Sequence, residues 1–261
     1  MPKDASGILS EIKKGHIENA LKTGSRADGR KLDQLRELRI ETNYIPRAQG
    51  SAFVNLGKTK VVVGIKVESG EPFPDTPNQG VMTTNVEMLP MAFPTFEPGP
   101  PNEESIEVAR VVDRGIRESK MIDLQKLCIE PGKKVMIVFI DIDVIDYDGN
   151  LIDACSLGAV AALHSAYYKV DENSKEEKLP VTSMPISVTI SKIGEELVCD
   201  PDLEEEQMAS ARLTVALNEN GNLCAMQKGN FGSFTIDEVK KAIAMSEVAG
   251  NMTRAYIKQV I

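Results

Sequence analysis

The segment that most constrains the fold covers residues 134–168 and has the pattern of a strand, a tight turn and a helix. Apolar residues alternate with polar ones in KVMIVFIDIDVIDY (134–147), which is typical of a strand with one buried face. The Asp-Gly-Asn sequence at 148–150 predicts a turn. The helix expected over 152–168 is rich in Ala, Gly, Ser and Cys, so it must pack closely against a sheet. The segment therefore indicates a layered fold of sheets and helices.

The whole chain repeats the order of strands followed by a helix, which predicts two stacked α+β lobes. Strands are expected at 37–44, 51–56, 60–68, 184–191, 195–199, 211–217 and 223–227, and further helices at 6–23, 103–119 and 236–258. Thr235 and Glu238 predict a capping box for the last helix. The stretch 69–101 is rich in proline and glycine but contains a short apolar run, so we expect a structured excursion rather than a linker. The expected division is an N-terminal helical extension (1–24), a first lobe (25–170), a charged connector (171–182) and a second lobe (183–261).

Composition excludes several classes of protein. No apolar run of about 18 residues is present and the N-terminus lacks the layout of a secretion signal, so a soluble, cytoplasmic protein is expected. The four cysteines form no CxxC pair, and His16 and His164 are the only histidines, so neither a metal site nor any other cofactor is expected. The net charge of −9 argues against a nucleic-acid platform over the whole surface. A few well-placed arginines would have to make any nucleic-acid contact.

Arginines follow one face of the helix expected after the proline-rich stretch. Arg110, Arg114 and Arg117 have the spacing i, i+4, i+7, so they share that face. Such a row suits phosphates, because each guanidinium can bind two oxygens. The alternative is that Glu107 pairs with Arg110 or Arg114, and Glu118 with Arg114. The residues alone favour this alternative, since charged helix faces are usually solvated. The residues expected to pack into the core are Ile106, Ala109, Val112 and Ile116.

Three sequence blocks together resemble the RNase PH superfamily, phosphorolytic exoribonucleases whose subunits form six-membered rings. The blocks are RADGR at 26–30, EPGPP at 97–101 followed by IEVARVVDRGIR at 106–117, and DYDGNLIDA at 146–154. The likeness covers about residues 20–258 and is closest to the non-catalytic RNase PH-type subunit of the archaeal exosome.

The resemblance implies an α+β sandwich with an RNase PH-type fold, in which two βαβα lobes pack into one unit. It also implies phosphate-dependent 3′→5′ RNA degradation by a hexameric ring, built from three heterodimers with a catalytic sister subunit. RNA-binding cap subunits and single-stranded RNA are the other implied partners, and no membrane is involved.

By the same resemblance, the turn at 148–150 has lost a phosphate site. A helix N-terminus binds anions, and catalytic members of the family carry Asp-Gly-Gly-(Thr/Ser)-Arg there. Here Asn150 takes the place of the second glycine, Leu151 replaces the hydroxyl and Ile152 replaces the arginine, while Asp153 adds a repelling charge. One lost charge-assisted hydrogen bond is worth roughly 1.5–3 kcal/mol. A simple strand-to-helix joint is therefore the favoured interpretation of this turn.

A second degenerate site is implied in the second lobe. Catalytic relatives carry Glu-Asp-x-x-Gly-Glu-Ala-Asp there, which supplies the acid that assists the leaving oxygen. In the matching stretch 205–212, Glu206 takes the place of the first aspartate and Arg212 that of the last. Glutamate can still carry a proton, whereas arginine cannot act as the acid. No catalytic residue is therefore expected in this chain.

The preferred hypothesis is a non-catalytic subunit that structures the active site of its neighbour and contributes arginines to RNA binding. The resemblance makes Arg110 the first candidate RNA ligand, Arg114 the second and Arg117 the third. Lys66 is a weaker candidate. Arg26 and Arg30 are expected to fix the N-terminal segment to the body of the protein.

Two alternatives remain open. The chain is a self-sufficient exoribonuclease that uses Asp200, Asp202 or the cluster Glu204–Glu206 with a metal, or it is a ring scaffold without any RNA contact.

Overall fold

Six strands form the first sheet of the computed structural model, which describes residues 15, 17–171 and 174–261. The strands are β1 (Leu38–Thr42), β2 (Gly50–Leu56), β3 (Thr59–Gly70), β4 (Val81–Met88), β5 (Cys128–Glu130) and β6 (Lys134–Asp146). Their order is β1-β2-β3-β6-β4, with β5 also paired to β6. Only the pair of β4 and β6 is parallel. Val138, Ile140 and Ile142 of β6 are fully buried, as the alternating pattern predicts.

Four strands form the second sheet, and each neighbouring pair is antiparallel. They are β9 (Ile186–Ile193), β10 (Glu196–Cys199), β11 (Ala211–Leu217) and β12 (Leu223–Gly229), in the order β10-β9-β11-β12. The sequence predicts all four within about two residues of these bounds, because both β9 and β11 are rich in β-branched residues.

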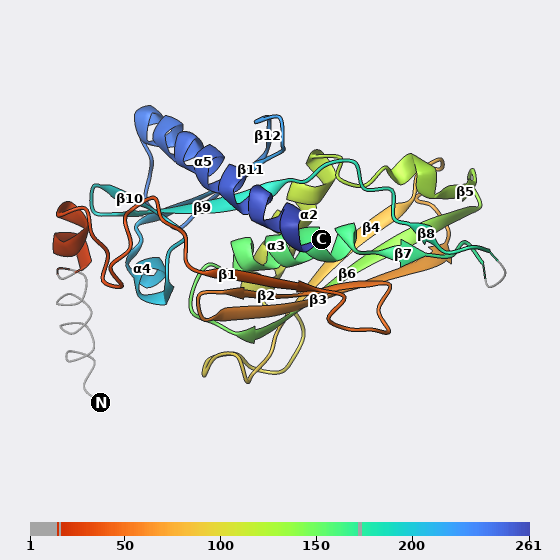
Figure 1. Ribbon diagram of the computed structural model, residues 1–261, viewed down its shortest axis with the longest axis horizontal. Coiled ribbons are helices and arrows are strands. Elements are labelled where there is room, and N and C mark those ends of the chain that lie inside the picture. The colour runs from red at the N-terminus through yellow and green to blue at the C-terminus, as the bar shows by residue number, and fades with distance from the viewer. Residues whose placement is uncertain (1–14, 16, 172–173) are drawn as a thin grey trace.

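Helices α2 (Glu103–Glu118) and α3 (Leu151–His164) lie between the two sheets, and α5 (Ile236–Val260) covers the other face of the second sheet (Figure 1). The small residues of α3 allow close packing on the first sheet, since a Cβ on Gly158 would lie 2.6 Å from a methyl of Val63. On its other side α3 meets β9, where the Ser156 and Ser187 hydroxyls are 3.1 Å apart. This arrangement confirms the predicted α+β sandwich.

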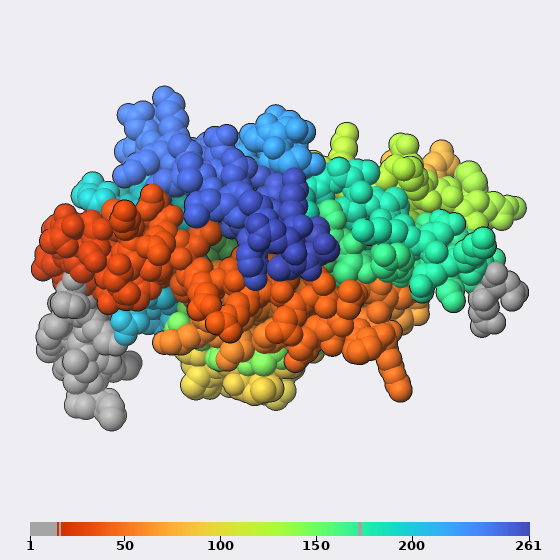
Figure 2. Space-filling view, in the orientation of Figure 1, coloured from red at the N-terminus to blue at the C-terminus, as the bar shows by residue number. Residues whose placement is uncertain are grey.

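The two lobes form one body. The surface is continuous from β1 to the end of α5 (Figure 2). Tyr256 of α5 accepts a hydrogen bond from the backbone N–H of Ile40 (3.4 Å), and the Thr42 hydroxyl donates to the carbonyl of Val260 (3.3 Å). The capping box of Thr235 and Glu238 at the start of α5 is confirmed. The division into four segments stays a prediction.

β4 and α4 are among the elements that occur where the sequence predicts none. β4 lies inside the stretch 69–101, and its sequence VMTTNVEM is too polar at its centre to indicate a strand. Parallel pairing with β6, in which each partner lies 56 residues further along the chain, stabilises it. The helix α4 (Leu203–Met208) contains the acidic cluster Glu204–Glu206, and Asp202 and Glu205 form its capping box.

The prediction of a helix to residue 168 is wrong at its end. α3 stops at His164, and β7 (Tyr167–Tyr168) pairs with β8 (Glu177–Lys178), inside the predicted connector. The backbone N–H of Tyr167 donates to the carbonyl of Gln49 (2.8 Å) instead of continuing the helix. Burial of Tyr168 against the core explains why the chain turns back here. A short 3₁₀ helix, η1 (Leu124–Leu127), precedes β5.

Most of the helix predicted over 6–23 falls on residues 6–14 and 16, which lie outside the described residues. Residues 17–22 are helical. Ile17 and Leu21 are buried there against Ile193 and Val198 of the second sheet. In the described part of the chain, every helix is too short or too polar to cross a bilayer.

Candidate nucleic-acid interface

The N-terminus of α3 is closed by a carboxylate of the chain itself. The backbone N–H of Asn150 donates to Oε2 of Glu206 (2.9 Å), and the Tyr147 hydroxyl donates to the same oxygen (3.2 Å). Glu206 therefore occupies the position where the helix dipole would attract an anion. The two side chains that follow, Leu151 and Ile152, are buried in the core. No side chain in this turn is free to hold a phosphate.

The Asn150 side chain holds two buried aspartates apart. Its Nδ2 donates to Oδ2 of Asp153 (2.8 Å) and to Oδ1 of Asp200 (2.7 Å). Asp153 also accepts hydrogen bonds from the backbone N–H and the hydroxyl of Thr189 on β9 (2.8 and 2.7 Å). Burial raises the pKa of Asp153 to about 7, although these hydrogen bonds act to lower it. Asp153 thus joins α3 to the second sheet rather than facing an incoming phosphate.

Arg36 fills the remaining space behind the turn. Its guanidinium pairs with Asp200 (Nη2 to Oδ1, 2.7 Å) and donates to the carbonyls of Asp148 (2.7 Å) and Gly149 (3.3 Å). Burial acts to raise the pKa of Asp200, but the hydrogen bonds and charge of Arg36 hold that pKa below its ordinary value. The sequence pattern does not predict this ion pair, because Arg36 and Asp200 lie in different lobes.

The two arginines of the RADGR block fix the N-terminal segment to the second lobe, as expected. Nε of Arg26 donates to Glu205 Oε1 (2.8 Å), and its Nη1 donates to the carbonyl of Cys199 (2.7 Å). Arg30 donates to the carbonyl of Asp200 (3.0 Å). Both side chains are at least nine-tenths buried, so neither is available to a ligand.

Arg212 lies in an acidic environment at the start of β11. It forms an ion pair with Glu107 of α2 (2.6 Å) and a longer one with Glu206 (3.7 Å). Burial and the charge of Glu206 raise the pKa of Glu104, which lies nearby. Where the resemblance would have an acid, the chain has a cation that neutralises its own carboxylates.

This pairing corrects the expectation about Glu107, which binds Arg212 rather than Arg110 or Arg114. Within the described residues, Glu118 makes no ion pair with Arg114 either. A rule based on spacing along one helix could not identify Arg212, because it belongs to the other lobe.

The buried face of α2 also differs from the expectation. Ile106 is 43% exposed and Ala109 is half-buried, whereas Val112 and Ile116 are buried as predicted. Ile106 lies four residues before Arg110, so it shares the exposed face of that arginine. The residues of α2 that pack into the core are Ser105, Val108, Val111, Val112, Gly115 and Ile116.

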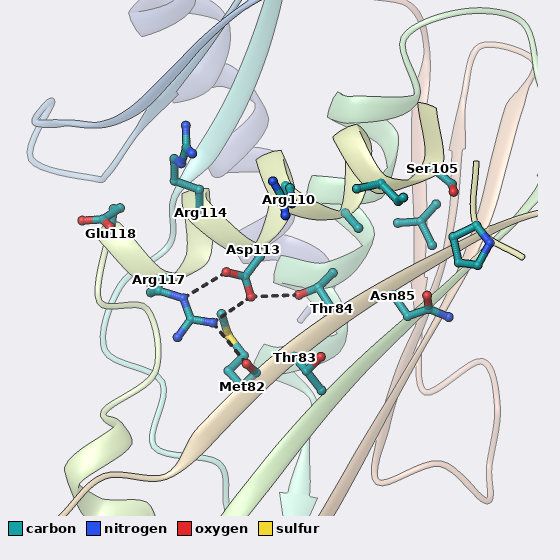
Figure 3. A pocket seen from close by; sticks show the side chains of 14 residues that line it. Met82, Thr83, Thr84, Asn85, Ser105, Arg110, Asp113, Arg114, Arg117 and Glu118 are labelled. Atoms are coloured by element: carbon teal, nitrogen blue, oxygen red, sulfur yellow. Dashed lines mark hydrogen bonds and ion pairs between the residues drawn. The ribbon is translucent and has the colours of Figure 1, made fainter. Parts of the chain in front are cut away.

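An open groove of about 520 Å³ runs between α2 and β4 (Figure 3). Arg110, Arg114 and Arg117 all line it, so the structure brings the three predicted arginines together. Arg117 is held by Asp113 (Nη2 to Oδ1, 2.9 Å) and by the carbonyl of Met82 (3.1 Å). Arg110 and Arg114 are exposed and have no hydrogen bond or ion pair with any described residue. Two of the three guanidiniums are therefore free to bind an anion.

The weaker candidates for RNA or metal binding form contacts within the protein. Lys66 on β3 forms an exposed ion pair with Glu68 (2.7 Å). In the acidic stretch, Asp202 accepts the backbone N–H of Glu205 (3.0 Å), and the carboxylate of Glu205 is buried against Arg26. Among the described residues, no three His, Cys, Asp or Glu side chains are grouped so that they could hold a metal ion.

Comparison with known proteins gives one consistent result over both lobes. Residues 34–168 match domain 1 of the 3′ exoribonuclease family, known as RNase PH, and residues 183–249 match domain 2 of that family. The chain is 60% identical over 260 residues to exosome complex component Rrp42 of Thermoplasma volcanium, covering 99% of this chain and 100% of that protein. It is 48% identical to the protein of the same name from Thermococcus kodakarensis, with 97% of each chain covered.

A solved structure described as the Archaeoglobus fulgidus exosome with RNA bound to the active site contains a similar chain. The two share 44% identity and a TM-score of 0.92, covering 95% of this chain and 99% of that one.

Proposed function

The chain belongs to the RNase PH-type 3′ exoribonuclease family, and from this premise we propose that it is a non-catalytic subunit of an exosome ring that degrades RNA. Relatives with the name exosome complex component cover nearly its whole length. In the proposed ring, three copies alternate with three copies of a catalytic sister subunit, and RNA-binding cap subunits complete the assembly. The ring acts on single-stranded RNA from its 3′ end.

The observation that carries the proposal of inactivity is the closed N-terminus of α3. Glu206 already accepts the N–H of Asn150, so an entering phosphate would have to displace a carboxylate from a partly buried position. Leu151 and Ile152 offer no replacement hydrogen bonds, because they belong to the core. A phosphate ion would lose several charge-assisted hydrogen bonds there, each worth about 1.5–3 kcal/mol.

The free arginines support a role in RNA binding at the active site of the sister subunit. Arg110 and Arg114 line the groove and have no hydrogen bond or ion pair with any described residue. A free guanidinium binds a phosphate without first breaking an ion pair, so these two residues are the proposed RNA ligands. Arg117 would have to leave Asp113 and is the weakest of the three.

Degradation of 3′-labelled and 5′-labelled single-stranded RNA tests both parts of the proposal. The purified chain alone should not shorten the RNA, with or without phosphate and Mg²⁺, whereas the complex with its sister subunit should do so when phosphate is present. Shortening by the chain alone would support the alternative of a self-sufficient exoribonuclease and overturn the proposal.

In the assembled complex, Arg110→Glu should lower RNA affinity and degradation rate roughly tenfold or more, because it removes one charge-assisted contact and adds repulsion. Arg39→Glu is the matched control, since Arg39 is an exposed arginine of β1 whose one ion pair with a described residue is with Glu37. Equal behaviour of the two variants would favour a scaffold without RNA contact.

A further inference from the structure

A large apolar side chain of α2 lies on the surface of the helix, among charged residues. Ile106 is 43% exposed, although isoleucine is one of the residues that proteins bury most often. The other exposed residues of α2 are all charged, namely Glu103, Glu104, Arg110, Arg114, Arg117 and Glu118. Helix stability does not explain the isoleucine, because a β-branched residue is a weaker helix former than alanine.

Ile106 belongs to a small apolar surface at one end of the groove. The groove follows α2, beginning beside Ser105 (Figure 3). Pro101 and Ala109 line it together with Ile106, and the side chains of all three are hydrocarbon. The Ser105 hydroxyl already donates to the carbonyl of Asn102 (3.0 Å). This end of the groove therefore offers a ligand apolar contact area.

The free arginines continue this apolar surface along the helix. Ile106, Arg110 and Arg114 follow one another at intervals of four residues, each about 6 Å along the helix axis. All three line the groove or its rim and are exposed. Neither arginine has a hydrogen bond or ion pair with any described residue. A ligand that fits this row must combine an apolar part with repeated negative charge.

A single-stranded nucleic acid combines these two parts in each nucleotide. Its phosphates suit a row of guanidiniums, because each guanidinium can bind two oxygens. Every nucleobase has a flat face that gains from contact with an apolar surface. Base and phosphate are separated by the ribose, so one nucleotide reaches from one helical turn to the next.

We propose that the base of one nucleotide packs on Ile106 and Pro101 while its phosphate binds Arg110. The inference rests on the proposed function, because it requires the RNA strand to lie along α2. Aliphatic carbon offers neither a hydrogen-bond donor nor an acceptor, so this contact accepts any base. It gives the non-catalytic subunit a contact with the base in addition to the phosphates.

The test measures the affinity of the assembled complex, without added phosphate, for single-stranded RNA and for copies that lack one base. The missing base is moved stepwise along the 3′-terminal part of the RNA. At one position its loss should weaken binding by the wild type roughly three- to tenfold, because apolar contact area is lost. Ile106→Ala should weaken binding of complete RNA by a similar factor and remove the penalty at that position alone. Ile106→Leu, which keeps the same number of carbon atoms, should retain most of the penalty.

Two further variants serve as controls. Ile129→Ala changes an isoleucine of β5 that is 38% exposed, and it should alter neither the affinity nor the penalty. Arg110→Ala should weaken binding of complete RNA and of RNA without the base in the same proportion, since the phosphate is present in both. Co-elution of both subunits from a sizing column verifies assembly of each variant.

The same penalties in Ile106→Ala as in the wild type, or no penalty at any position in the wild type, would overturn the inference. Weaker binding by Arg110→Ala would in that case leave the proposed function intact. Loss of co-elution in Ile106→Ala would also overturn the inference, because Ile106 would then contact the sister subunit. If Arg110→Ala and Ile106→Ala both bind RNA like the wild type, the groove is not the RNA path and the proposed role in RNA binding fails as well.

Discussion

Asn150 is the residue on which the closed turn depends. Its backbone N–H reaches Glu206, and its side chain reaches Asp153 and Asp200. The left-handed backbone of Asn150 (φ 55°) allows all three contacts, and asparagine tolerates this conformation better than most residues. A single residue thus links α3, α4 and the end of β10, where a phosphate-binding turn would need open space.

Protonation of Asp153 should make stability depend on pH. Its pKa is raised by burial from an ordinary value of 3.8 to about 7, so between these values the folded chain keeps a proton that the unfolded chain has released. The free energy of unfolding therefore falls as the pH rises through this window. Because asparagine does not titrate, the destabilisation caused by Asp153→Asn should shrink between pH 4.5 and 7.5.

Urea denaturation of both proteins at the two pH values measures this difference. His164, whose pKa burial lowers to about 4, contributes a slope of opposite sign, since the unfolded chain binds its proton first as the pH falls. That slope is common to both proteins and cancels in the comparison. A destabilisation that stays constant with pH would contradict the prediction.

At the residue scale, sequence reasoning identified the side chains whose chemistry is unusual for their position. Leu151 and Ile152 are apolar where an anion site would need donors, and both are in the core. It did not identify Arg36, because nothing in its neighbourhood marks a partner 164 residues away. Pairs of this kind depend on the packing of the two lobes.

The connection between β6 and α3 depends on Gly149. Its φ of +87° is strained for other residues, and a Cβ would lie 2.5 Å from the carbonyl carbon of Asp202. Gly149→Ala should therefore destabilise the protein by roughly 2 kcal/mol or more, since it combines backbone strain with a clash against fixed backbone. Gly99→Ala is the control, because no atom lies within 4 Å of its Cβ position. Thermal unfolding of both variants measures the difference in stability, and equal melting temperatures would contradict the predicted destabilisation by Gly149→Ala.

At the element scale, local patterns identified the elements whose stability is local. The period of two in β6, the spacing of α2 and the capping box of α5 are all readable along the chain. β4 is stabilised by β6 and by α2, so its own sequence carries little signal. The sequence contains the two residues of the α4 capping box, Asp202 and Glu205, but a helix of six residues is too short to show a helical period.

For the assembled ring, the three arginines should differ in the salt dependence of RNA binding. Each phosphate contact on a single strand contributes about 0.7 to the slope of log affinity against log salt. Arg110→Ala and Arg114→Ala should each reduce the slope by about this amount, as expected for free guanidiniums. Arg117→Ala should leave it unchanged, because Arg117 stays with Asp113 and the carbonyl of Met82. Binding titrations at several salt concentrations supply the slopes, and equal slopes for the three variants would contradict the ranking.

The bond between Arg212 and Glu107 fastens the first turns of α2 to the second lobe, while β4 and α3 hold the same helix to the first. Because α2 is attached to both lobes, it cannot move with one lobe alone. Movement of one lobe relative to the other would change the tilt of α2 and displace the free guanidiniums of Arg110 and Arg114. Substitutions far from the groove, at the contact between the lobes, should then weaken the proposed RNA binding before they lower the stability of the fold.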